Sequence, residues 1–335
     1  MVFRIADYAK YNSMQLLVQN SQSRLSQLQI QASTARAGEN YGDIASDSNQ
    51  ALKLENTFIK TQRYQQNIKA ANSVLDHTET SVARIQEIAT QLKTLLTTAL
   101  NGGNSSTMNL DNQANNLLQN LKSELNKQVD GNYIFAGGMT NTAPVDITRW
   151  GAPMPAPTNL NAPAAYTVPT FPAIPATFPV TIAANASAEF YGYYTGNTTL
   201  PTVRASDSMN VNYGVTAADP AFAKLTYALR LAATVNGTPS SEQTDRLNGA
   251  MTLVDQVVGS LADMRSSIGS QGKLMDDTNK AHEDYLGKIE GLVNDIQGAD
   301  VTETMSKLSA EQTQLQASFM IISRLSQVSL ARYLQ

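Results

Sequence analysis

The sequence predicts a mainly α-helical protein with a β-rich insert. Apolar residues recur at alternating steps of three and four in both terminal segments and in two long inner segments, which is the spacing of a helix stripe that packs on another helix. All but one of the 12 prolines lie between residues 144 and 220, and proline is excluded from helix interiors. The predicted fold is a long antiparallel helical rod or coiled coil formed by the N- and C-terminal halves, with a β-hairpin after a helical hairpin and a small central β domain.

The two ends of the chain carry matching stripes. In the N-terminal segment the stripe consists of Tyr11, Met14, Val18, Leu25 and Leu28. The C-terminal segment has no glycine or proline after Gly298, and its stripe consists of Val301, Met305, Leu308, Leu315, Phe319 and Ile322, with Leu325 and Val328 beside it. Such stripes cannot face water over several heptads. The two terminal helices are therefore expected to pack on each other.

The first half of the interior predicts a helical hairpin. One helix is expected from about Ser48 to Leu100, because its stripe keeps register and then meets Gly102 and Gly103, a typical helix end. A shorter helix over 109–128 is expected to fold back on it. Asp130-Gly131 is a turn signal, and the strand formers Tyr133, Ile134 and Phe135 follow it.

The second half of the interior predicts the return helices. Asp219-Pro220 begins a helix, and Ser240 or Ser241 caps a second one that runs to about Ile296. Several stripe positions of this long helix are polar, which indicates a weaker or bent seam there, or contact with another subunit: Arg265, Gly272, Asn279 and His282.

These elements divide the chain into five segments. They are an N-terminal assembly helix with its loop (1–47), an inner helical hairpin with the β-turn (48–143), an exposed β-rich insert (144–219), the return helices (220–298) and a C-terminal assembly helix (299–335).

Composition excludes several classes of function. Charged residues make up only 16% and the net charge is −4, so nucleic acid is not an expected partner. The absence of cysteine removes disulfides, thiolate nucleophiles and zinc–thiolate sites. No apolar run is long enough to cross a membrane, and the first 20 residues lack the apolar core of a secretory signal peptide.

The sequence offers no catalytic constellation. No metalloprotease, nucleophile-elbow, P-loop or dinucleotide motif occurs. Of the two histidines, His282 lies near Asp277, Glu283 and Asp284, so a metal or proton site is one interpretation. A polar residue facing solvent or a neighbouring helix is the preferred interpretation. No enzyme activity, cofactor or metal is expected.

Aromatic residues in the insert allow a ligand hypothesis. Weakly charged loops rich in proline and aromatics can bind carbohydrate or a host surface, but such residues more often form the core of a small β domain. The residues concerned are Trp150, Phe190, Tyr191, Tyr193 and Tyr194.

Three stretches of the sequence resemble the bacterial flagellin superfamily. One is the inner helix around Asn67-Ile68 and Ala71-Asn72, and another is the ending LQASFMIISRLSQVSLARYL. The third is a motif that looks most like the hook-associated branch of the family and consists of Gly131, Tyr133, Ile134, Phe135, Gly137 and Gly138. In one respect the chain departs from the family: AGENYGDIASD replaces the usual basic-plus-Asn motif after the first helix.

The resemblance implies a structural subunit of the flagellum, located outside the cell and exported through the flagellar type III apparatus without a cleaved signal peptide. Its implied partners are itself and other axial proteins (hook-associated proteins, hook and flagellin), with an export chaperone, and neither nucleic acid nor membrane. The two terminal stripes would then form the subunit-assembly interface.

The sequence is also compatible with other functions. The hook–filament junction protein is favoured by the motif and the single modest insert, and a filament-forming flagellin is the alternative. A surface adhesin or carbohydrate-binding protein on a helical stalk is a more distant one. A type III needle or tip protein also has long terminal helices, but such chains are usually built without the glycine-rich motif.

Overall fold

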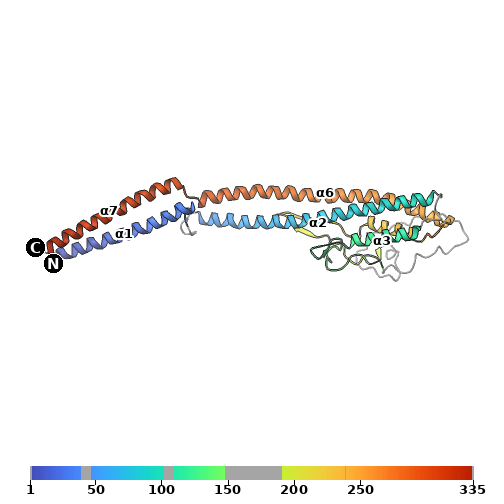
Figure 1. Cartoon of the computed structure of the whole chain (residues 1–335), viewed down its shortest axis with the longest axis horizontal. Helices are drawn as coiled ribbons and strands as arrows, with labels where there is room; N and C mark the ends of the chain where they lie inside the picture. The colour runs from blue at the N-terminus through green and yellow to red at the C-terminus, as the bar shows by residue number, and fades with distance from the viewer. Residues whose placement is uncertain (1, 39–46, 102–108, 148–190, 238, 334–335) are drawn as a thin grey trace. The chain divides into compact units, whose positions relative to one another are not determined.

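The computed structural model describes residues 2–38, 47–101, 109–147, 191–237 and 239–333. These residues form two compact units by their internal contacts (Figure 1). The first unit comprises Met1–Gln62 and Glu283–Gln335, and the second comprises Arg63–His282. Two long helices, α2 (Ser48–Leu100) and α6 (Ser241–Gln297), contribute to both units.

The prediction of a mainly helical chain whose terminal helices pack together is confirmed. Helix α1 (Val2–Thr34) contacts α7 (Val301–Tyr333) in the first unit, and helix α3 (Leu110–Leu125) contacts α5 (Pro220–Ala233) in the second. Among the described residues, no helix is long and apolar enough to cross a membrane.

Local side-chain chemistry fixes where these helices begin. The Asp219 carboxylate accepts a hydrogen bond from the Ala221 backbone N–H at 2.8 Å, and Pro220 occupies the first turn. Ser240 and Gln243 exchange hydrogen bonds between each side chain and the other's backbone N–H, which is a capping box. Asp300 accepts from the backbone N–H groups of Thr302 and Glu303. Each cap satisfies donors that a helix start leaves without partners.

The core of the second unit lies among α2, α3, α5 and α6 and combines aliphatic with aromatic side chains. Arg84 on α2 forms an ion pair with Glu124 on α3 at 3.1 Å, as expected for helices that fold back on each other. The Phe135 ring meets the Phe222 ring edge-on at 5.9 Å between centroids. These contacts tie the chain after α3 to the start of α5.

Two short antiparallel hairpins complete the second unit. Strands β1 (Gln128–Val129) and β2 (Asn132–Tyr133) pair around Asp130 and Gly131, both of which have positive φ, as a tight hairpin turn requires. Strands β3 (Thr202–Arg204) and β4 (Asn210–Asn212) form the other hairpin. Residues 148–190, which hold most of the predicted central β domain, lie outside the described residues.

One strand prediction is wrong. Of the three strand formers, only Tyr133 lies in β2, and Ile134 and Phe135 leave the strand and enter the core. Phe135 is fully buried and its carbonyl accepts a hydrogen bond from the Ala217 N–H at 2.9 Å. Burial of these side chains, with Phe135 packed on Phe222 of α5, therefore overrides their strand propensity.

Candidate assembly interface

The terminal helices meet along a seam that is partly polar. Helices α1 and α7 lie antiparallel with both chain ends at one end of the pair (Figure 1). Val18 and Ser21 of α1 are buried in this seam, as are Thr304 and Ser318 of α7. Arg24 forms an ion pair with Glu311 across the seam at 3.1 Å. A seam with buried hydroxyls and a partly exposed ion pair gains less free energy than an all-apolar one.

Backbone hydrogen bonds join the other ends of these two helices. The Ala37 N–H donates to the Gln297 carbonyl at 2.7 Å, and the Ala299 N–H donates to the Ala35 carbonyl at 2.9 Å. Arg36 and Gly298 thereby form an isolated antiparallel bridge. We call this arrangement the backbone bridge. It sets which turn of α1 lies beside which turn of α7.

The structure divides the predicted stripe of α7 between two surfaces. Leu308, Leu315 and Ile322 are half-buried against α1. Val301, Met305 and Phe319 are 40%, 51% and 48% exposed. Within the chain, the seam with α1 runs through Thr304, Glu311 and Ser318. The sequence pattern instead predicts a seam through the apolar residues next to them.

On α1, the predicted residues lie mostly in the seam. Val18 is buried, and Met14, Leu25 and Leu28 are half-buried. The side chains of Tyr11, Leu325 and Val328 lie outside the described residues.

Several large apolar side chains that sequence reasoning did not select are exposed on the same two helices. These are Leu16 and Leu17 on α1 and Met320 and Ile321 on α7. They were missed because adjacent apolar residues do not follow a 4-3 step. Val301, Met305 and Phe319 share one side of α7, and we call these three residues the outer apolar face. Large apolar side chains that stay exposed among the described residues, as these do, are typical of an interaction surface.

The glycine-rich motif is a structural junction in the second unit. Gly131 occupies the β1–β2 turn, with φ of 80°. Gly137 packs against the backbone of Asn197, and the Gly138 N–H donates to the Asn197 side-chain oxygen at 2.6 Å. The motif therefore joins the segment after α3 to the segment before β3, and no reactive side chain takes part.

The tyrosine cluster is core, which contradicts the ligand hypothesis for its described members. Tyr191, Tyr193 and Tyr194 are fully buried. The Tyr193 hydroxyl donates to the Ala217 carbonyl at 2.7 Å, and burial raises the pKa of Tyr193 well above its usual value. Burial likewise raises the pKa of the Asp219 carboxyl. Trp150 and Phe190 lie outside the described residues.

The polar stripe positions of α6 find partners within the chain. The Arg265 guanidinium forms an ion pair with Glu79 at 2.6 Å and donates to the Gln86 side chain at 3.0 Å. His282 lies 2.7 Å from the Ala205 carbonyl oxygen through Nε2. Among the described residues, no cluster of His, Asp and Glu could hold a metal ion.

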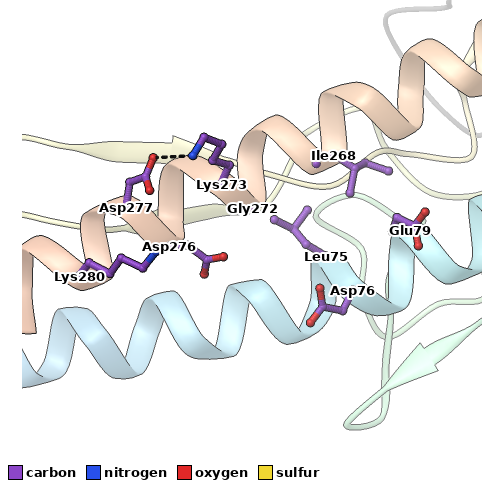
Figure 2. A pocket seen from close by; sticks show the side chains of 10 residues that line it. Leu75, Asp76, Glu79, Ile268, Gly272, Lys273, Asp276, Asp277 and Lys280 are labelled. Carbon is purple, nitrogen blue, oxygen red and sulfur yellow. Dashed lines mark ion pairs between the residues drawn. The ribbon is translucent and has the colours of Figure 1, made fainter.

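A groove between α2 and α6 surrounds another of these positions, Gly272 (Figure 2). Three of its charged side chains have partners: Lys273 pairs with Asp277 at 3.4 Å, and the Asn72 amide donates to Asp276 at 2.6 Å. A Cβ added at Gly272 would meet nothing within 4 Å. No neighbouring atom of the described chain therefore lies so close to Gly272 that a side chain there would clash.

Replacing Gly272 with Ala is expected to stabilise the second unit by about 0.5–1 kcal/mol, because alanine favours a helix interior over glycine by about that amount. Thermal unfolding of the purified chain measures the effect. Gly259→Ala, also in α6 with open space around it, is the matched control and should give a similar gain. A loss of stability at Gly272 alone would contradict the observed open space.

Comparisons with known proteins agree with this architecture. The model of the bacterial flagellin N-terminal helical region matches residues 5–140, and the model of the bacterial flagellin C-terminal helical region matches residues 251–334. Together they match well over half of the chain. No curated protein sequence matches it.

Two solved structures illustrate the shared fold. A candidate flagellar hook-associated protein from Vibrio parahaemolyticus is 15% identical, with a TM-score of 0.55 over 75% of this chain and 97% of that one. The FlgL protein of Bacillus cereus is 12% identical, with a TM-score of 0.51 over 72% of this chain and 99% of that one. At these identities the similarity shows a common fold.

Proposed function

Because this chain belongs to the bacterial flagellin family and is a structural protein of the flagellum, we propose that it forms the junction between hook and filament. Two observations support this position over the filament itself. Both solved relatives carry hook-associated descriptions or names and are covered almost end to end. The motif from Gly131 to Gly138 resembles the hook-associated branch.

The outer apolar face is the observation that carries the assembly mechanism. It exposes Val301, Met305 and Phe319 on α7 beside a partly polar seam. In an assembled ring, neighbouring subunits cover this face, and each large side chain that becomes buried contributes roughly 1.5–3 kcal/mol. The half-buried stripe residues of α1 and α7 complete the interface. The work of the protein is this packing, and no catalytic step is involved.

The partners follow from this position. Copies of the same chain lie beside it, and hook-associated proteins, hook and flagellin lie above and below it. An export chaperone covers the apolar terminal helices before export through the type III apparatus, which requires no cleaved signal peptide. A filament-forming flagellin is the second candidate, since the matching family models describe flagellin regions.

Immunogold labelling of intact flagella distinguishes the two positions. An antibody raised against the purified full-length chain is expected to give a single spot at the boundary between hook and filament, and flagella from a strain lacking the gene should show none. Label along the whole shaft would make the chain a filament flagellin. Label on the cell surface away from flagella would support an adhesin and overturn the proposal.

A further inference from the structure

The pairing of α2 with α6 has a polar layer near the end of the second unit. Along α6, Ile268 and Met275 are buried one heptad apart, and the next position of that repeat is His282. Across from it on α2 lies Tyr64, whose ring stacks on the histidine ring at 5.9 Å between centroids and 25° between planes. This layer pairs two aromatic rings, whereas the preceding positions of the repeat on α6 are the aliphatic Ile268 and Met275.

The loop between β3 and β4 hydrogen-bonds to both helices at this layer. The Tyr64 hydroxyl donates to the Asp207 carboxylate at 2.8 Å. Nε2 of His282 lies 2.7 Å from the Ala205 carbonyl oxygen, which can only accept, so this nitrogen carries the proton. One loop of five residues, 205–209, therefore bridges α2 and α6.

Hydrogen bonds and an ion pair within the hairpin hold the loop 205–209 in its observed conformation. The Arg204 guanidinium donates to the carbonyl oxygens of Ser206 and Asp207, both at 3.3 Å, and pairs with the Asp207 carboxylate at 3.5 Å. The Ala205 N–H donates to the Met209 carbonyl at 2.9 Å. These contacts within the loop place the Asp207 carboxylate, which is 64% exposed, beside the Tyr64 hydroxyl.

The hairpin is small, and it joins the core of the second unit through the side chains of Val203, Ala205 and Val211. Each strand has three residues, and only Val203 and Val211 are buried along them. A two-stranded hairpin of this size is marginally stable without its surroundings. The contacts of Phe135 with Phe222 and of α3 with α5 do not involve it. Local opening of such a small element can leave the rest of a domain folded.

We propose that the loop 205–209 is a releasable strap that holds α2 and α6 together where they leave the second unit, at Arg63 and His282. With the strap closed, the Tyr64–His282 layer is fixed. With the strap open, this layer separates locally and the rest of the unit keeps its core. The strap is a conformational device and acts within one chain, whatever the position of the subunit in the flagellum.

A buried alanine in the strap makes opening measurable. Ala205 is fully buried, and the chain has no cysteine, so Ala205→Cys introduces a single thiol that reacts only when the strap opens. Ala223→Cys is the matched control, because Ala223 is equally buried but lies in α5. The thiol at 205 is expected to react at least roughly tenfold faster than the thiol at 223, since local opening is more frequent than global unfolding.

The Tyr64→Phe substitution then tests the contact itself, since it keeps the ring stack and removes the hydrogen bond to Asp207. In the Ala205→Cys background it is expected to speed labelling by about tenfold, the effect of losing one hydrogen bond to a charged acceptor, and to leave labelling at 223 unchanged. Equal acceleration at both sites would show that the loop opens only with the whole unit and would overturn the proposal. No acceleration at 205 would also overturn it.

Hydrogen exchange on the cysteine-free chain provides a second measurement that needs no thiol. Tyr64→Phe is expected to raise exchange at residues 202–212 and around His282, and to leave α3 and α5 at the parental rate. A uniform rise across residues 63–282 would overturn the strap as a separate opening unit.

Discussion

Replacing Phe319 with Asp is expected to abolish incorporation of the chain into flagella and to leave the second unit folded. Phe319 is 48% exposed on the outer apolar face, so a carboxylate there is largely solvated in the isolated chain. In the assembled state the same carboxylate would be buried without a partner, which costs several kcal/mol per subunit. Every subunit in the ring carries that cost.

Complementation of a deletion strain measures this effect through motility and through the protein recovered in sheared flagella. Gln314→Asp is the matched control, because it places the same charge at an exposed polar position of the same helix. That variant should assemble like the parent. Circular dichroism of both purified variants should show the parental unfolding transition. Normal motility of the Phe319 variant would mean that this face does not enter the assembly interface.

Replacing Gly137 with Ala is expected to destabilise the second unit by about 2–5 kcal/mol. Its φ of 65° is a backbone conformation that costs a residue with a Cβ about 1–2 kcal/mol. The added Cβ would also fall on the Asn197 carbonyl oxygen and lie 2.9 Å from the Thr199 carbonyl oxygen. Overpacking of this kind costs about 1–3 kcal/mol more.

Gly131→Ala separates these two contributions. Gly131 also has positive φ, at 80°, but a Cβ there meets nothing within 4 Å. This control should lose only the conformational part, about 1–2 kcal/mol. Denaturant unfolding of the two variants gives both values. Equal losses would show that the Asn197 contact contributes nothing to stability.

The helices could be predicted because their signals are local. The stop at Gly102 and Gly103, the Asp219-Pro220 start and the pairing of Ser240 with Gln243 each act within one turn, and the structure places helix ends within a few residues of these signals. The β1–β2 turn was predictable for the same reason. Asp130 and Gly131 both adopt positive φ, and Asp-Gly is a preferred sequence for a two-residue turn of this kind.

Long-range choices could not be predicted in the same way. Two adjacent rows of side chains run along α7, and both rows include Leu308, Leu315 and Ile322. The row that faces α1 also contains Thr304 and Ser318. The hydrophobic pattern alone predicts that the other row, with Met305 and Phe319, faces α1. The contact of His282 with the β3–β4 loop joins residues 77 positions apart, and no local signal announces it.

The backbone bridge has a consequence for how this protein can change in length. Helices α1 and α7 have 33 residues each, and each helix has one end next to the backbone bridge. A heptad inserted into α1 alone would extend one helix by about 10 Å past the end of its partner. The two helices therefore have equal lengths when both are measured from the backbone bridge. We expect only equal, paired insertions to keep the ends flush.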